Sequence, residues 1–199
     1  MGYEAIVIGV SAGGMEALSA ILPELPADLP CPVIIVQHMS PESGSFLASI
    51  LDGKTQITVK EVEEKGKIEP GTVYIAPSNY HTLVEYDRTF SLSVDPPVNY
   101  ARPSIDVLFE SAADVYRNRL IGIILTGANK DGSQGLRRIK DIGGITIVQD
   151  PATAEVDSMP NAAIAAAEPD YILPLDQIGS FIATFMVTTQ VDRLKAEGF

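Results

Sequence analysis

The sequence predicts an α/β protein with a doubly wound, mostly parallel sheet, helices on both faces and a small antiparallel insertion. Three observations predict this class. Short and nearly uninterrupted apolar runs recur along the chain, as in parallel strands that are buried on both faces. Helical stretches follow several of these runs, which is typical of strand–helix–strand units. Turns rich in Gly and Pro separate the two kinds of segment.

The first four elements show this alternation clearly. Ala5–Val10 is a β-branched run that ends in Gly-rich sequence and is expected to be the first strand. A helix is expected over Met15–Leu22, and Pro23 stops it. Val33–Gln37 is a second apolar strand, and a helix from about Ser45 to Leu51 follows a polar loop.

The middle of the chain has a different pattern, with four short strands and little helical sequence between them. The expected strands are Ile57–Val62, Val73–Ala76, Thr82–Tyr86 and Phe90–Val94. The residues Tyr86-Asp87-Arg88-Thr89 are suited to a hairpin turn. We expect this region to form an antiparallel insertion or an edge to the main sheet.

The strand–helix alternation resumes after Pro103. The expected elements are helix Ile105–Tyr116, strand Ile121–Leu125, helix Gly135–Ile142, strand Thr146–Gln149, helix Pro160–Ala166, strand Tyr171–Leu173 and a helix from about Asp176. Pro160 would stand at the first helical position, which proline favours. The 199 residues predict a single domain over 1–199.

Composition excludes several kinds of protein. The chain has 26 acidic and 14 basic side chains, a formal charge of −12, which argues against binding nucleic acid or an anionic membrane. One cysteine and two histidines exclude a disulfide framework and a Cys-rich or His-rich metal site. No apolar run approaches the ~18 residues that a membrane span needs, and the N-terminus lacks the basic region of a signal peptide. A cytoplasmic protein without membrane insertion is therefore expected.

The turn after the first strand carries the first candidate catalytic residue. Gly9–Gly14 fits G-x-S-x-G, the nucleophile elbow that lifts a serine hydroxyl off the carboxyl edge of a sheet. Ser11 would be the nucleophile, and N–H groups at the start of the helix, from Ala12 and Gly13, would stabilise an oxyanion. A phosphate-binding loop and a plain turn are the alternatives. Against the phosphate-binding loop, the spacing is not G-x-G-x-x-G and no Lys-Ser/Thr pair follows.

Two further candidates follow other strands. His38 comes directly after the second strand, and Asp131 lies in the Gly-rich loop after Leu120–Leu125. Because neighbouring parallel strands end at one edge of the sheet, Ser11, His38 and Asp131 can meet there. His38 would then act as general base, and Asp131 would orient its imidazole.

Each of these assignments has an alternative. His81 also follows a strand and could line the same cleft, and Asp131 could instead cap the helix after it. Asp106 and Asp150 are rival carboxylates. The chain order of serine, histidine and then acid differs from the α/β-hydrolase order, so a triad here would belong to another hydrolase fold.

Taken together, these segments resemble the catalytic domain of the CheB family, the bacterial chemotaxis protein-glutamate methylesterases. The matching stretches are collinear over about residues 3 to 175 and are Ile6–Gly14, Gln37-His38-Met39, Tyr74–Pro77 with His81, Arg102–Phe109, Gly122–Gly127 with Asp131-Gly132, and Met159-Pro160 with Ala163-Ile164.

The resemblance implies a serine hydrolase that removes methyl groups from methylglutamate side chains of chemoreceptors and deamidates certain receptor glutamines. Ser11 would attack the ester, His38 would transfer protons, Asp131 would orient His38, and water would hydrolyse the acyl-enzyme. The amides near Ala12 and Ala128 would bind the oxyanion. No metal or organic cofactor is needed. The implied partners are the cytoplasmic helices of methylated chemoreceptors.

Other residues bear on substrate binding and control. Arg102 precedes a Pro and a helix and could meet an acidic receptor surface, as could the basic side chains between about residues 112 and 141. The family loop usually reads Thr-Gly-Met-Gly-x-Asp-Gly, whereas Ala128 and Asn129 stand here at the Met and second Gly positions. Because of this departure, the second hypothesis after a methylesterase is an interaction module without catalytic activity. The third hypothesis is a nucleotide-binding domain.

Family members typically carry a receiver domain before the catalytic domain, whereas the first strand here begins close to Met1. A chain without that domain is expected to be constitutively active or controlled by a separate regulatory protein.

Overall fold

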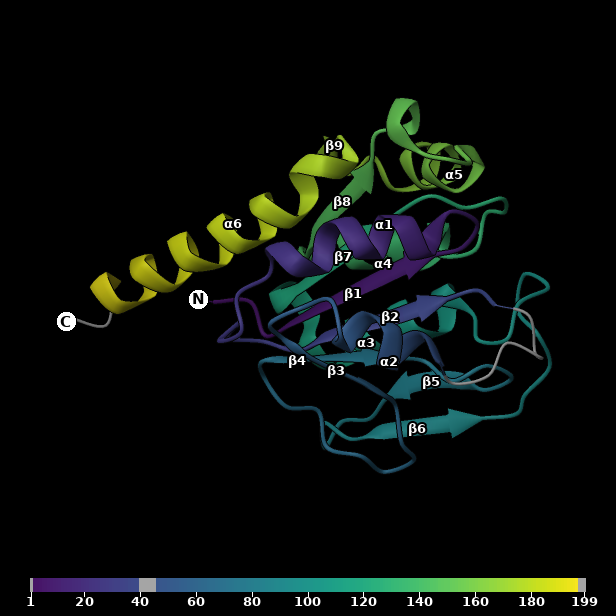
Figure 1. Cartoon of the computed structure of the whole chain (residues 1–199), viewed down its shortest axis with the longest axis horizontal. Helices are drawn as coiled ribbons and strands as arrows, with labels where there is room; N and C mark the ends of the chain where they lie inside the picture. Colours follow the sequence, from purple (N-terminus) through teal and green to yellow (C-terminus); the bar gives the residue numbers. More distant parts are fainter. Residues whose placement is uncertain (1, 40–45, 197–199) are drawn as a thin grey trace.

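A seven-stranded parallel sheet forms the centre of the protein (Figure 1). The computed structural model describes the backbone of residues 2–39 and 46–196, with side chains in these ranges up to Met186. The strand order is β3 (Thr58–Glu61), β4 (Thr72–Ile75), β2 (Val33–Gln37), β1 (Ala5–Val10), β7 (Leu120–Ile124), β8 (Ile145–Gln149) and β9 (Tyr171–Leu173). Every neighbouring pair is parallel, which confirms the predicted doubly wound class.

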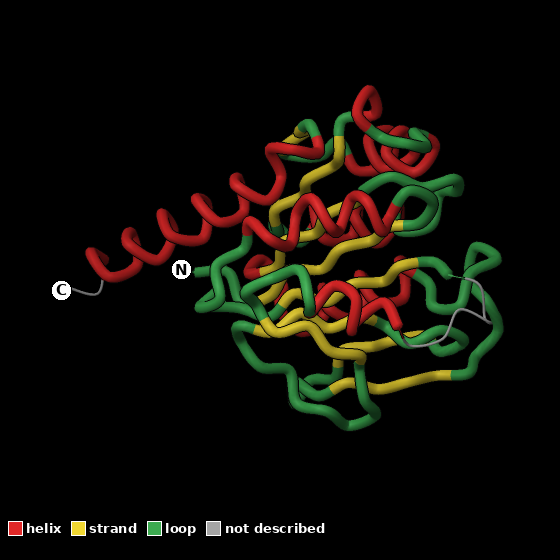
Figure 2. The backbone as a smooth tube through the Cα atoms, in the orientation of Figure 1, coloured by secondary structure: helices red, strands yellow, loops and turns green. Residues whose placement is uncertain are grey.

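Helices cover both faces of the sheet (Figure 2). One face is covered by α1 (Gly14–Ile21), α2 (Phe46–Asp52) and α6 (Leu175–Ala196), and the other by α3 (Ile105–Tyr116), α4 (Ser133–Asp141) and α5 (Ser158–Ala167). Strand β1 contributes Ile6 and Ile8 to the first apolar core and Val7 to the second, because successive side chains of a strand point to opposite faces. The sheet is therefore buried on both faces.

A separate antiparallel pair, β5 (His81–Val84) and β6 (Phe90–Ser93), packs beside α3. Its turn is closed by the Glu85 amide, which donates to the Thr89 carbonyl over 2.9 Å, as the predicted hairpin requires. For the two strands before it, the other alternative holds, because they form an edge of the main sheet. The predicted strands Ile57–Val62 and Val73–Ala76 correspond to β3 (Thr58–Glu61) and β4 (Thr72–Ile75); β3 pairs parallel with β4, and β4 pairs parallel with β2. Local sequence shows that a strand forms but does not show which strand it pairs with.

Two smaller differences concern helix starts. Helix α5 begins at Ser158, so Pro160 is its third residue and not its first. Helix α2 is described from Phe46, and the predicted start at Ser45 lies outside the described residues. Within the part of the chain that the structure describes, no helix is both long and apolar enough to cross a membrane.

The strand order changes direction at β1. From β1 the chain first builds β2 and its neighbours on one side, and later β7, β8 and β9 on the other. In open parallel sheets, ligands bind at the carboxyl ends of the strands beside such a switch point. The segments that follow β1, β2 and β7 therefore meet at the expected position of a functional site.

Candidate active site

Ser11 lies in the turn between β1 and α1. Its amide donates to the Thr126 carbonyl over 3.0 Å, which continues the pairing of β1 with β7 by one residue. Gly13 then adopts φ 75° and caps α1, a left-handed conformation that glycine adopts without strain. The serine thus stands at the carboxyl edge of the sheet, directly before a helix, as the elbow pattern predicts.

Gln37, the last residue of β2, ties the Ser11 turn to the neighbouring one. Its side-chain amide donates to the backbone carbonyls of Ser11 over 2.8 Å and His38 over 2.9 Å. A side chain on Gly14 would stand 1.8 Å from Gln37 Oε1, so this close approach requires glycine. Gln37 was predicted as the end of the second strand but without this role, although a glutamine that ends an apolar strand was a usable signal.

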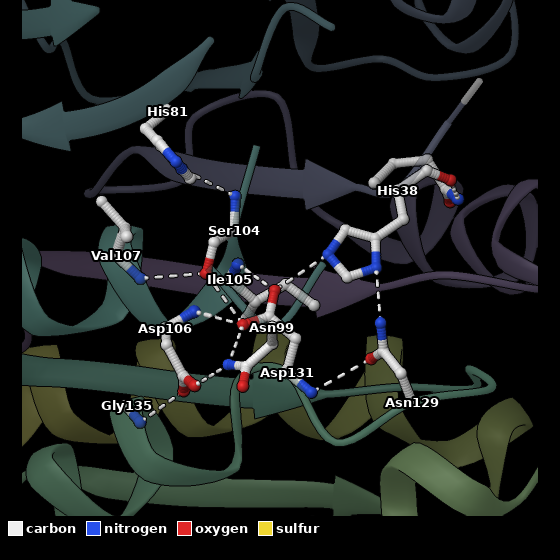
Figure 3. A network of polar contacts seen from close by, with 11 residues as sticks. His38, His81, Asn99, Ser104, Ile105, Asp106, Val107, Asn129, Asp131 and Gly135 are labelled. Atoms are coloured by element: carbon white, nitrogen blue, oxygen red, sulfur yellow. Dashed lines mark hydrogen bonds and ion pairs between the residues drawn. The ribbon is translucent and has the colours of Figure 1, made fainter. Parts of the chain in front are cut away.

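His38 contacts Asp131 directly (Figure 3). The distance from His38 Nε2 to Asp131 Oδ2 is 2.9 Å, and the two side chains are 12% and 0% exposed. An ionised carboxylate only accepts hydrogen bonds, so Nε2 carries the proton and Nδ1 of the neutral ring keeps its lone pair. The helix-cap alternative for Asp131 is wrong, because Gly132 at φ 90° caps α4 and no side chain bonds there.

The Asp131 carboxylate is held by a set of donors from the start of α3 and from Asn99, which precedes that helix (Figure 3). Besides His38, these donors are Asn99 Nδ2 at 3.0 Å, Ser104 Oγ at 2.8 Å, the Ile105 amide at 2.6 Å and the Asp106 amide at 3.3 Å. Burial alone would raise the pKa of Asp131, but the hydrogen bonds outweigh burial and lower it. The amino end of a helix also favours negative charge. Asp131 is therefore built to stay ionised.

Asp106, a rival carboxylate, stands behind this network. It accepts hydrogen bonds from the Gly135 amide over 2.7 Å and from Asn99 Nδ2 over 2.8 Å. Burial is the main cause that raises its pKa to about 6, and the nearby Asp131 adds to the effect. The other rival, Asp150, accepts from the Ala152 amide and caps a short 3₁₀ turn. Asp131 is the carboxylate that the structure brings to His38.

Asn129 lies on the opposite side of the His38 ring. Its Oδ1 accepts from the Asp131 amide over 3.0 Å, which fixes the orientation of the side-chain amide. Its Nδ2 then faces His38 Nδ1 at 3.5 Å, a long contact. The substituted loop position thus places a donor beside the ring nitrogen that is free to act as a base.

His81 does not reach the His38 ring. It is 2% exposed, its Nδ1 accepts from the Ser104 amide over 3.2 Å, and its Nε2 lies 3.2 Å from the Pro96 carbonyl. Both ring nitrogens are occupied by backbone groups. The structure therefore places His81 as a support for Ser104, the residue that donates to Asp131.

A cavity of about 360 Å³ opens at this edge of the sheet. It is lined by Ser11, His38, Met39, Asn79, Pro97, Tyr100, Ala101, Arg102, Pro103 and Asn129. Ala12, Gly13, Ala128 and His81 are not among these residues. Arg102 is the cationic member of the lining, and its Nη1 donates to the carbonyls of Val94 and Asp95 over 2.8 and 3.2 Å.

Ser11 and His38 line the cavity together, but the described contacts include no hydrogen bond between the Ser11 hydroxyl and the ring. Catalytic hydrogen bonds often tighten only when substrate binds. In the same described part of the chain, no cluster of three or more His, Cys, Asp or Glu side chains is placed to hold a metal ion.

The basic side chains between residues 112 and 141 are largely neutralised by acidic neighbours. The ion pairs are Arg119 with Glu4, Arg137 with Asp141, Arg138 with Asp114 and Lys140 with Asp170. These pairs weaken the expectation that this region attracts an acidic surface. Arg102 at the cavity is the better placed cation.

Comparisons with known proteins agree on one family. The family model described as CheB methylesterase matches residues 6–182. A Leptospira interrogans protein named "Putative protein-glutamate methylesterase/protein-glutamine glutaminase" is 55% identical over 178 residues, which cover 89% of this chain and 92% of that protein. A Caulobacter vibrioides protein named "Protein-glutamate methylesterase/protein-glutamine glutaminase 2" is 41% identical over 91% of this chain and 53% of its own length.

A solved structure agrees with these matches. The crystal structure of the Thermotoga maritima CheB methylesterase catalytic domain superposes with a TM-score of 0.89 at 36% identity, covering 93% of this chain and 100% of that chain. The predicted family and the predicted fold are both confirmed.

Proposed function

The chain belongs to the CheB methylesterase family, and from that premise we propose that it hydrolyses glutamate methyl esters of chemoreceptor proteins with Ser11, His38 and Asp131 as its catalytic triad. The observation that carries the proposal is the 2.9 Å contact between His38 and Asp131 at a cavity that Ser11 also lines. Relatives are also named glutaminases, so deamidation of receptor glutamines is the related second reaction.

Acylation begins with the Ser11 hydroxyl. His38 Nδ1 accepts its proton while Oγ attacks the ester carbonyl carbon, and a tetrahedral oxyanion forms. Backbone amides of the turns that carry Ala12 and Ala128 stabilise that oxyanion. The protonated ring then gives its proton to the departing methoxide oxygen, so methanol leaves and an acyl-enzyme ester remains.

Deacylation repeats these steps with water. His38 Nδ1 takes a proton from the water that attacks the acyl carbon, and it returns this proton to Ser11 Oγ as the glutamate carboxylate departs. Asp131 remains ionised throughout and stabilises the imidazolium through Nε2–H. In the serine-protease triad the acid contacts Nδ1 of the histidine and the serine contacts Nε2. Here the two nitrogens exchange roles, because Asp131 contacts Nε2 and Nδ1 serves Ser11.

The decisive experiment removes the nucleophile. Ser11→Ala is expected to abolish methanol release from a receptor fragment that carries methylated glutamates, whereas Ser180→Ala, on the exposed side of α6, is expected to leave the rate unchanged. Methanol is measured by a coupled oxidase assay. Unchanged release by Ser11→Ala, or no release by the unsubstituted chain, would refute the proposal, and the second result would favour an inactive interaction module.

The cytoplasmic location and control by a separate regulatory protein stay predictions. Binding of the receptor's cytoplasmic helices is part of the proposal. This binding follows from the proposed reaction, because the ester on the receptor helix must enter the cavity that Ser11 lines. Arg102 lies in the same lining and can meet acidic side chains of that helix.

A further inference from the structure

A two-residue turn stands at the mouth of the cavity. Val98 and Ala101 exchange two backbone hydrogen bonds, of 3.1 and 2.9 Å, around Asn99 and Tyr100. Both central residues have positive φ, 51° and 65°. Turns with two left-handed central residues strongly favour Asn followed by Gly. Asn99 fits this preference, whereas Tyr100 occupies the position that suits glycine.

The fold accounts for Asn99. Its side-chain amide donates to Asp131 Oδ1 over 3.0 Å and to Asp106 Oδ2 over 2.8 Å. These two bonds fasten the turn onto buried carboxylates, one of which contacts His38. Asparagine also tolerates the left-handed region better than most residues do. The turn is consequently a fixed part of the site.

The fold does not account for Tyr100. Its relative exposure is 105%, so its ring buries no surface against the protein, and a β-carbon is disfavoured at φ 65°. Tyr100 nevertheless lines the cavity together with Ser11 and His38. A strained and fully exposed aromatic residue beside reacting groups points to a role in contact with a ligand.

We propose that Tyr100 is a specificity-determining residue that packs on the aliphatic side chains of the substrate protein's helix, next to the glutamyl ester that enters the cavity. This inference rests on the proposed function. A tyrosine ring offers a large contact area at a low entropic cost, as it does at protein interfaces. Because Asn99 fixes the turn, the backbone needs no rearrangement to present the ring to the helix.

Arg102 lines the same cavity as Tyr100, and these two residues form what we call the rim of the cavity. Its guanidinium is positioned by the Val94 and Asp95 carbonyls, and none of the ion pairs of the described residues includes it. The rim thus offers one apolar and one cationic contact. This combination suits an acidic amphipathic helix.

The test compares a protein substrate with a small one. Tyr100→Gly is expected to lower kcat/KM on a methylated receptor fragment about tenfold, as for an interface hot spot, and to change hydrolysis of N-acetylglutamate γ-methyl ester less than about twofold. Its Tm is expected to rise by about 2–4 °C, because glycine relieves the turn. Tyr100→Phe should keep both activities, because the ring and not the hydroxyl makes the contact.

The matched control is Tyr86→Ala, which removes a tyrosine that is 77% exposed in the β5–β6 turn and is not part of the cavity lining. It should leave both rates unchanged. Equal losses on the two substrates, or no loss on the receptor fragment, would overturn the proposal for Tyr100. Failure of the unsubstituted chain on both substrates would instead refute the proposed function, and the inference with it.

Discussion

Replacing Asp131 by asparagine gives the sharpest test of the triad. Every partner of this carboxylate is a donor: His38, Asn99, Ser104 and two backbone amides of α3. A carboxylate accepts from all of them, whereas a carboxamide has one oxygen and presents two N–H donors of its own. The substitution therefore preserves the size of the side chain and reverses half of its hydrogen bonding.

The expected loss follows from these contacts. If the new amide nitrogen replaces Oδ2, it faces His38 Nε2 across 2.9 Å and the Ile105 amide across 2.6 Å. His38 can satisfy the contact only by moving its proton to Nδ1, and the ring then has no lone pair where the Ser11 proton must go. The same tautomer fault costs about 10⁴ in kcat in a serine protease triad. We expect a loss of roughly 10³–10⁴, or about 4–5.5 kcal/mol in the activation barrier.

Stability should also fall, by about 1–3 kcal/mol, because the buried Ile105 amide loses its acceptor. The substitution also removes the stabilisation by the ionised carboxylate, which depends on pH. Since the folded pKa of Asp131 is lowered, the carboxylate stabilises the protein above its unfolded pKa, and this stabilisation disappears as the pH falls through the folded value. The difference in unfolding free energy between the unsubstituted chain and Asp131→Asn should therefore shrink in acid.

Three measurements separate the chemistry from the fold. They are kcat on the small ester, the ¹⁵N shifts of the His38 ring, which report the tautomer, and urea unfolding. Ser104→Ala is the matched control, because it removes one neutral donor to Asp131, together with the side-chain cap of α3, and keeps the charge; we expect it to retain at least about a tenth of kcat. If Asp131→Asn retained as much, or if the tautomer were unchanged, Asp131 would not orient the base.

Two further substitutions test neighbouring groups. Asn129→Gly should raise kcat on the small ester about two- to fivefold, since it removes a weak donor that competes with Ser11 for His38 Nδ1; an unchanged or lower kcat would contradict this competition. Asp106→Asn should gain stability relative to the unsubstituted chain as pH rises from about 4 to 7, by up to about 3 kcal/mol in urea unfolding. The folded pKa of Asp106 is about 6, so the stabilisation by its protonated form is lost from the unsubstituted chain as the pH rises through that value, and asparagine has no such loss. A difference in unfolding free energy that stays constant with pH would refute this prediction.

Most of the sheet could be predicted because burial on both faces leaves a local signature. Strands β1 and β2 are buried at every position, and their apolar runs have the predicted bounds. For β3 and β4 the sequence predicted the strands but left open whether they form an antiparallel insertion or the edge of the main sheet, because their runs are short and the neighbouring hairpin is antiparallel. Pairing partners depend on contacts between distant segments, which local periodicity does not contain.

The same division applies to the candidate site. Ser11, His38 and Asp131 could be proposed because each follows a parallel strand, and such strands end at one edge of the sheet. Gln37 and Asn99 escaped notice because their roles depend on their partners. Gln37 joins the carbonyl of the adjacent His38 to that of Ser11, 26 positions away, and Asn99 reaches Asp131 from 32 positions away in the sequence.

Asn99 links the turn at the cavity rim to the proposed triad through its hydrogen bond to Asp131. The amide that holds the rim turn is also one of the donors that keep Asp131 ionised, and Asp131 in turn holds the His38 ring. A substitution that moves the turn should therefore disturb the base, whereas one that changes only the exposed ring at position 100 should not. Glycine adopts the φ of 65° at position 100 without strain, so Tyr100→Gly removes the ring and leaves the turn in place, and it can separate recognition of a protein substrate from the chemistry of ester hydrolysis.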